Sequence, residues 1–407
     1  MSPVVSEARY VPGGGAAWAD PWPSYAALRD HDPVHHVVPE GRPGQDFYVL
    51  SRHEDVLHAA VDTATFSSAQ GLTVAYGELE KIGLVDNPPL VMLDPPEHTA
   101  FRRLVSRGFT PRAVRDVEPD VRAYVAERLD AFVVAGGGDI VVDLFKPLPS
   151  MVVAHYLGVP AEDRDSFDGW TDAIVAASSA GAPSGAADAT MAMLGYFTEL
   201  IERRRRELAQ GRHGADTVSH LVTAGVGDDE AGLLSILGYI FAMVTGGNDT
   251  TTGALGGAVQ LLAERTDQRE LLVAGPSLVA GAVEEFLRLT SPVQALARTA
   301  TRDVELRGVR IPAGRKVLLC YAAGNRDPRR FGPDAEELDV LRNPTQILTF
   351  GQGSHHCIGN AAARMMARVA LEELLARIPS FTVDAEGVTW APGPYVRRPL
   401  TVPMVVR

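Results

Sequence analysis

The chain has 407 residues, of which 46% are hydrophobic and 22% charged, so it can bury a sizeable core and lacks the composition of a disordered protein. Its formal net charge of −13 argues against nucleic acid as the main partner, because neutralising phosphates requires a basic face. The two cysteines, Cys320 and Cys357, and a start without the regions of a signal peptide predict a cytoplasmic protein without disulfides. No linker divides the chain, so we expect one domain over residues 1–407, and a monomer.

The first hundred residues mix short helices and strands. Helical patterns at 22–31 and 53–61 alternate with apolar runs at 34–38 and 47–51 that favour strands. From 66 to 96 the sequence is irregular over a length that is uncommon in compact domains and is often functional. We therefore expect this segment to form a substrate gate.

Helical periodicity dominates the middle of the chain. From His98 to about Thr290 apolar residues recur at helical spacing, with predicted breaks at 181–185 and 224–229. The sequence therefore predicts a mainly α fold with small β-sheets. The helical body is expected from about 98 to 378, and strands mainly from the first 70 or so residues, 300–320 and 380–407.

The most apolar stretch runs from Ala231 to Thr245 and continues directly into Asn248 and Asp249. It is shorter than the roughly 20 residues that a membrane span needs. We therefore expect a buried central helix and no membrane association.

The segment 350–359 reads Phe-Gly-Gln-Gly-Ser-His-His-Cys-Ile-Gly, and a helical pattern follows at once. A thiolate at a helix N-terminus receives backbone N–H donors and the positive end of the helix dipole, so we expect a lowered pKa for Cys357. An anionic sulfur is the proximal ligand that haem iron needs if an O–O bond is to be cleaved. Gly351, Gly353 and Gly359 would permit tight turns beside a flat ligand.

Two other readings of this segment are weaker. A lone cysteine is more often a small buried hydrophobe, and a zinc site on His355, His356 and Cys357 would lack a spaced fourth ligand. The pattern of Phe, Gly, Gly, His, Cys and Gly instead resembles the cysteine signature of the cytochrome P-450 family. The resemblance implies the fold of that family, a triangular prism with a long central helix over haem b. It also implies that Cys357 ligates the iron, that Phe350 and Gly359 contact the cofactor, and that His356 is structural.

Further motifs of that family follow in order. Glu285 and Arg288 lie three apart on one helical face, which by itself is typical of a surface ion pair. The resemblance implies instead that both are buried with Arg342 and brace the cysteine loop. A buried charge trio contributes little raw stability, so we expect it to specify geometry.

Cationic side chains are expected to bind the haem propionates, because buried carboxylates need charge-assisted donors. Any one of these residues alone would be read as a solvated surface group. The ordered set that matches the family's positions consists of His98, Arg102, Arg298 and His355.

The central helix carries a polar island, Gly246-Gly247-Asn248-Asp249-Thr250. A buried carboxylate needs a partner or a function, and the glycines weaken the helix, so we expect a local opening there. The island resembles the family's acid–Thr motif. The resemblance implies that Thr250 orients dioxygen and an ordered water, and that Asp249 passes protons in from solvent.

The resemblance therefore implies a haem-thiolate monooxygenase that oxidises a medium-to-large apolar organic substrate with dioxygen. The chain resembles the soluble actinobacterial members of the family, which implies that electrons from NAD(P)H arrive through a ferredoxin and its reductase. No flavin or nicotinamide fingerprint is present, so the electrons are expected to come from separate proteins. The alternatives are a peroxide-dependent hydroxylase on the same fold, and a non-catalytic haem sensor or sequestering protein. The acid–Thr pair argues against both.

By the same resemblance the substrate pocket is expected to be lined by small or uncharged side chains, namely Ala242, Thr245, Gly246, Gln294, Leu296 and Val396. The two helices nearest the sulfur are basic, and we expect them to form the docking face for an acidic ferredoxin. Their arginines are Arg102, Arg103, Arg107, Arg112, Arg364 and Arg368.

Overall fold

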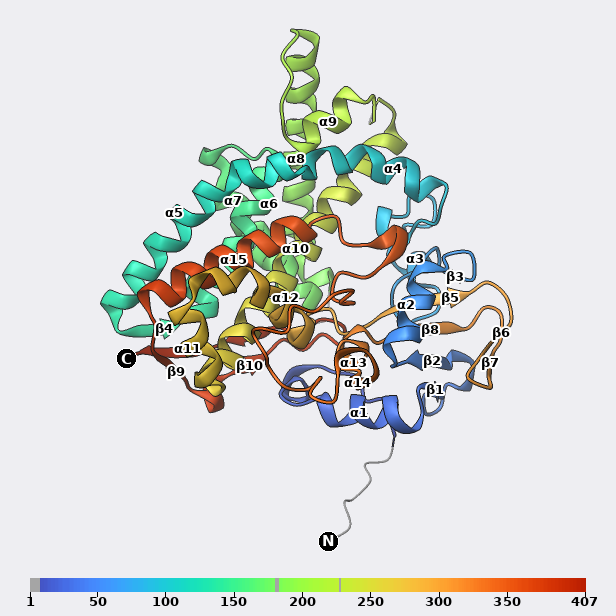
Figure 1. Ribbon diagram of the computed structural model, residues 1–407. Helices are drawn as coiled ribbons and strands as arrows, with labels where there is room; N and C mark the ends of the chain where they lie inside the picture. The colour runs from blue at the N-terminus through green and yellow to red at the C-terminus, as the bar shows by residue number, and fades with distance from the viewer. Residues whose placement is uncertain (1–7, 180–182, 227) are drawn as a thin grey trace.

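The computed structural model describes residues 8–179, 183–226 and 228–407 (Figure 1). Part of the predicted break at 181–185 and one residue of the break at 224–229 lie outside these ranges. The first four predicted elements occur where the sequence places them. They are α1 (Trp22–His31), β1 (Val34–Val37), β2 (Phe47–Leu50) and α2 (His53–Val61).

The body of the molecule is helical, as the apolar periodicity predicts. Its longer helices are α4 (Glu97–Val105), α5 (Pro111–Ala135), α6 (Pro147–Leu157), α7 (Arg164–Ser179), α8 (Ala187–Ala209), α9 (Thr217–Thr223), α10 (Glu230–Glu264), α11 (Thr266–Ala274), α12 (Val279–Thr290) and α15 (Asn360–Arg377). The short helices α13 (Tyr321–Gly324) and α14 (Pro328–Phe331) precede the cysteine loop. Helices α5 and α15 lie side by side in Figure 1, and apolar residues of both belong to the largest core cluster.

The strands form small sheets in two regions beside this body: β1, β2, β3, β5 and β8 lie on the right of Figure 1, and β4, β9 and β10 on the left. The largest has the order β1-β2-β8-β5-β3, and β2 pairs in parallel with β8. A second sheet has the order β4-β12-β9, and β6 pairs with β7 and β10 with β11. The remaining bounds are β3 (Phe66–Ser67), β4 (Gly137–Asp139), β5 (Leu296–Ala300), β6 (Val304–Leu306), β7 (Val309–Ile311), β8 (Lys316–Leu319), β9 (Phe381–Val383), β10 (Thr389–Trp390), β11 (Pro399–Thr401) and β12 (Pro403–Val406).

The segment 66–96 is less irregular than the sequence predicts. It contains β3, the short helix α3 (Glu78–Ile82) and the 3-10 turn η3 (Leu90–Met92). Together with Glu97 it lines a cavity of about 600 Å³. The fixed turns explain how so long a connection stays ordered at the surface.

Helix α10 runs through the body and packs against α6, α7, α12 and α15. Within the described residues, α10 is the one helix whose length and apolar composition would allow it to cross a membrane. Small residues on it allow other segments to come very close. A Cβ at Gly253 would lie 2.7 Å from the carbonyl oxygen of Arg397, and one at Gly256 would lie 2.5 Å from Cγ of Pro399. The C-terminal chain is therefore held directly against the central helix.

Candidate functional site

The cysteine loop folds by local hydrogen bonds and two glycines. The N–H of Cys357 donates to the carbonyl of Phe350 across 2.8 Å, which closes the loop. Gly351 and Gly353 have φ angles of 65° and 71°, a region that L side chains rarely adopt. A Cβ at Gly353 would also lie 2.9 Å from the carbonyl of Ala60. Helix α15 begins immediately after Gly359.

The electrostatics of the sulfur differ from the prediction. Burial raises the pKa of the Cys357 thiol, whereas the N–H of Gly359 and the charges of Arg102 and Arg364 act to lower it. The expected net lowering by the helix end is therefore wrong for the protein groups acting alone, because desolvation of an anion outweighs them. A bound cation such as iron is the group that would hold this sulfur as a thiolate.

The four donors predicted to hold haem propionates come from distant segments and meet in one cluster. His98 and Arg102 lie on α4, Arg298 lies on β5, and His355 ends the short turn η9 (Gly353–His355). The rings of His98 and His355 have centroids 4.2 Å apart. Burial lowers the pKa of His355 to about 3, and the other three donors act in the same direction. The structure thus gathers buried donors and cations that repel one another.

This cluster fits a ligand with carboxylates. Nδ1 of His98 and Nε of Arg298 are buried and have no hydrogen-bond partner within residues 8–179, 183–226 and 228–407. Asp94 lies close enough to raise the pKa of His98, but Ser67 and Ser68 already donate to its oxygens. Haem propionates would supply the missing acceptors and the negative charge.

Helix α4 is also tied to the cysteine loop itself. Nη2 of Arg102 donates to the backbone carbonyl of His356. The hydroxyl oxygen of Ser68 lies 3.2 Å from Nε2 of His355. The sequence analysis did not identify Ser68.

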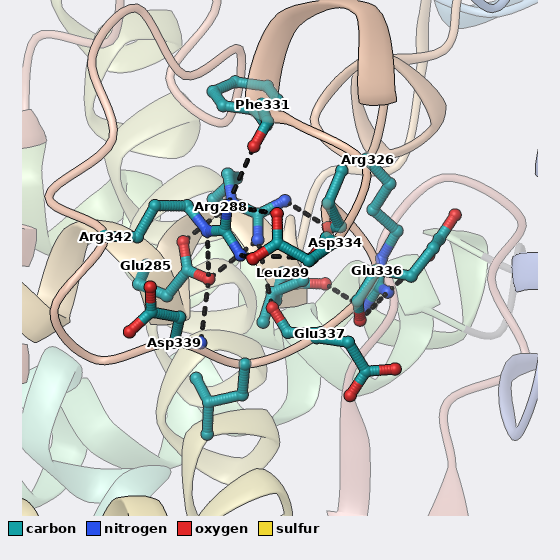
Figure 2. A network of polar contacts seen from close by, with 12 residues as sticks. Glu285, Arg288, Leu289, Arg326, Phe331, Asp334, Glu336, Glu337, Asp339 and Arg342 are labelled. Carbon is teal, nitrogen blue, oxygen red and sulfur yellow. Dashed lines mark hydrogen bonds and ion pairs between the residues drawn. The ribbon is translucent and has the colours of Figure 1, made fainter.

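The predicted charge trio is assembled by the fold (Figure 2). Glu285 and Arg288 form a two-bonded ion pair with both distances at 2.7 Å, and both side chains are 0% exposed. Nε of Arg342 lies 3.1 Å from Oε1 of Glu285, and Arg342 also pairs with Asp334. The trio therefore holds the 331–342 chain against helix α12.

The trio reaches the cysteine loop through Asn325. Arg288 donates to the carbonyl of Asn325 across 2.8 Å. The Asn325 side chain accepts from the N–H of Leu348 at 2.6 Å and donates to Oγ1 of Thr349 at 2.9 Å. Because Thr349 directly precedes Phe350, a continuous hydrogen-bonded path links the trio to the start of the loop.

The polar island of α10 differs from its prediction in one respect. The helix continues through Gly246 and Gly247 without a break. The hydroxyl of Thr250 donates to the carbonyl of Gly246 across 2.7 Å. That bond satisfies the carbonyl that an opening would expose, so the helix stays closed and the Thr250 oxygen keeps its lone pairs for another donor.

Asp249 is buried and has a cationic partner that the sequence analysis missed. Nε of Arg398 lies 2.8 Å from Oδ1 of Asp249, and both side chains are largely removed from solvent. The segment 395–400 is otherwise mostly apolar, so its two adjacent arginines were the available signal. Nothing in the sequence gives their partner.

The predicted pocket residues are not all equivalent. Ala242, Thr245 and Leu296 are half-buried, and a Cβ at Gly246 would meet no heavy atom within 4 Å. The side chain of Gln294 is 1% exposed and donates to the carbonyls at the end of α12. The structure therefore gives Gln294 no face on an open space. Val396 forms an isolated β-bridge with Val293.

Comparisons with known proteins agree with this geometry. Residues 277–388 match the family model described as cytochrome P-450. Cytochrome P-450 130 of Mycobacterium tuberculosis is 64% identical over 392 residues, which is 96% of each protein. Vitamin D(3) 25-hydroxylase of Pseudonocardia autotrophica is 35% identical and covers 91% of this chain and 89% of its own length.

The fold is shared with solved structures as well. The cytochrome P-450 PksS of the Bacillus subtilis bacillaene polyketide synthase has a TM-score of 0.85 and 27% identity, with 98% of this chain and 100% of that chain covered. The chain therefore belongs to the cytochrome P-450 family of haem-thiolate monooxygenases.

Proposed function

We propose that this enzyme inserts one oxygen atom of dioxygen into a medium-to-large apolar organic substrate, in the cytoplasm, with electrons delivered by a ferredoxin and its reductase. The observation that carries the proposal is the pair of Asp249 and Thr250 on α10. Asp249 is in a buried ion pair, and the hydroxyl of Thr250 donates to the carbonyl of Gly246. Binding haem alone would require neither group.

Bound haem supplies the binding and reductive activation of dioxygen, and a thiolate ligand favours O–O cleavage. Cys357 would be the iron ligand, with Phe350 and Gly359 beside it. His98, Arg102, Arg298 and His355 would bind the propionates. The fit rests on Nδ1 of His98 and Nε of Arg298, two buried donors that lack acceptors in the part of the chain described.

The part of the reaction that the chain's own residues carry out is the delivery of protons. Thr250 directs its hydroxyl proton to Gly246, so its oxygen is presented as an acceptor for a water or another donor in the space beside Gly246. Asp249 would take a proton from solvent and release it to that water.

The substrate is proposed to lie in the space bounded by Ala242, Thr245, Gly246, Leu296 and Val396, without Gln294. These side chains are small or apolar, which suits an apolar molecule. The relative named vitamin D(3) 25-hydroxylase supports a substrate of such size. The segment 66–96 is proposed as the gate to this space.

The electron donor is proposed to dock on Arg103, Arg107 and Arg112, which are exposed. The other predicted docking arginines serve internal contacts. Arg364 binds Glu284 with two hydrogen bonds, at 2.5 and 3.1 Å, and Arg368 pairs with Glu118 and Glu372. A smaller basic face remains, and it would steer an acidic ferredoxin chiefly by raising the association rate.

The test supplies the enzyme with isotopically labelled dioxygen, a ferredoxin, its reductase and NAD(P)H, over a panel of apolar substrates chosen by shifts of the haem absorption band. The proposal expects labelled product that requires every component. Product that forms with peroxide and not with the reductase would favour the peroxide-dependent alternative. Binding without any product would favour a sensor.

A further inference from the structure

A buried ion pair joins the C-terminal segment to the acid of the central helix. Nε of Arg398 and Oδ1 of Asp249 are 2.8 Å apart, and the two side chains are 5% and 11% exposed. Ionised groups are costly to bury unless they are paired. The fold therefore keeps a guanidinium beside the carboxylate that is proposed to carry protons.

The backbone fixes the position of this guanidinium. The N–H of Arg397 donates to the carbonyl of Pro292 across 2.8 Å, and the N–H of Ala391 donates to the carbonyl of Arg398 across 2.9 Å. Gly253, one helical turn after Asp249, lets the carbonyl of Arg397 approach α10 so closely that a Cβ there would lie 2.7 Å from it. Arg398 is thus anchored against α10 and is not a mobile surface cation.

We propose that Arg398 is a positioning residue for oxygen activation, which holds the Asp249 carboxylate in one orientation and as an anion between proton transfers. The proposal rests on the proposed role of Asp249. In each transfer Asp249 accepts one proton from water and releases one proton toward Thr250. Arg398 itself transfers no proton in this scheme and acts through its charge and position.

A purely structural role would be different. If Arg398 only tethered the C-terminal segment to α10, its removal would damage every activity of the site alike. If it positions Asp249, removal should affect the steps that need protons from solvent. Turnover driven by hydrogen peroxide needs neither reduction by ferredoxin nor this proton supply, so it separates the two roles.

The experiment compares Arg398→Gln, Arg398→Lys, Asp249→Asn and the double variant Asp249→Asn/Arg398→Gln, with the exposed Arg310→Gln as control. For each we would measure the rate of product formation and the product per NAD(P)H consumed with ferredoxin and reductase, the solvent isotope effect on both, peroxide-driven turnover, and the thermal unfolding midpoint.

We expect Arg398→Gln to lower product per NAD(P)H by about fivefold or more and to change the solvent isotope effect, with peroxide-driven turnover within about twofold of the parent. Arg398→Lys should restore at least about half of the yield, because it keeps the charge. In the Asp249→Asn background, Arg398→Gln should change the yield by less than about twofold, since the partner is already gone.

Two results would overturn the inference. One is an Arg398→Gln variant that keeps the rate and yield of the parent while Asp249→Asn is slowed or uncoupled. This result would leave the proposed function intact. The other is equal loss of NAD(P)H-driven and peroxide-driven turnover. If Asp249→Asn itself turns over at the parent rate and is fully coupled, the proposed function fails instead. Should Arg398→Gln not fold, the comparison of Asp249→Asn with the double variant decides: equal yields support the inference, and a further loss contradicts it.

Discussion

Glu285 and Arg288 form an ion pair, 2.7 Å between Oε1 and Nη2, from which solvent is completely excluded. Arg342 pairs with the same carboxylate. Asn325 accepts a hydrogen bond from Arg288 and another from the N–H of Leu348, just before the cysteine loop. Such a pair adds little net stability over a well-packed apolar core, yet losing one partner leaves a buried charge. Its effect is therefore to fix the chain that leads to Cys357.

Glu285→Ala should destabilise the protein by about 3–5 kcal/mol, because Arg288 would keep a buried charge without its carboxylate. The free energy of unfolding by urea, with haem content measured in parallel, checks this. The control is Glu337→Ala, whose side chain is 69% exposed and pairs with Arg265; it should cost less than about 1 kcal/mol. Equal losses in the two variants would show that burial of the trio does not matter.

Thr250→Ala should still bind haem and substrate but divert reducing equivalents into peroxide or water. Asp249→Asn should slow turnover by about a hundredfold, the lower end of the usual contribution of a positioned proton donor. The measurements are the rate of product formation and the product and peroxide formed per NAD(P)H consumed. Unchanged yield and rate in both variants would remove the acid–Thr pair from the account.

Arg103→Glu/Arg107→Glu should slow ferredoxin-dependent reduction by about tenfold at low ionic strength, with a smaller difference at high salt where the charges are screened. Arg42→Glu/Arg310→Glu makes the same charge change on exposed residues of the β-rich region and is the control. If both pairs of substitutions slow reduction equally, net charge rather than a docking face sets the rate.

His53 predicts a pH dependence of stability. It is 5% exposed, its Nε2 lies 2.9 Å from the carbonyl of Gln346, and burial lowers its pKa from 6.5. As pH falls below about 6.5 the unfolded chain takes up a proton that the folded chain resists, so stability falls by up to about 1.4 kcal/mol per pH unit from this group.

His53→Gln should therefore flatten the loss of unfolding free energy between pH 6.5 and 5, relative to the parent protein. His213→Gln, at an exposed position, is the control and should leave the slope unchanged. Identical slopes for His53→Gln and the parent would mean that His53 titrates normally in the folded state.

The features that the sequence predicts well are local ones. The helix at 53–61 and the turn around Gly351 and Gly353 depend on neighbours in the chain, so composition and spacing suffice. The same holds for the cysteine placed just before a helix. Family resemblance added the distant partners of that loop, such as Arg298 and Arg342.

The features that it misses depend on packing between distant segments. Residues 137–139 carry no strand periodicity and become β4 only because β12 pairs with them. The partner of Asp249 is found only when the C-terminal segment has packed on Gly253. The pKa of Cys357 was predicted from the helix end alone, whereas burial, a tertiary property, outweighs it.

The most direct test of the account is the absorption spectrum of the reduced carbon monoxide complex of Cys357→Ser, beside that of Cys320→Ser. Cys320 is fully buried in another core cluster, so its replacement controls for loss of a buried thiol. The account predicts that Cys357→Ser loses the red-shifted band that thiolate ligation gives and all monooxygenation, and that Cys320→Ser keeps both. A normal band in Cys357→Ser would contradict the assignment of Cys357 as the iron ligand.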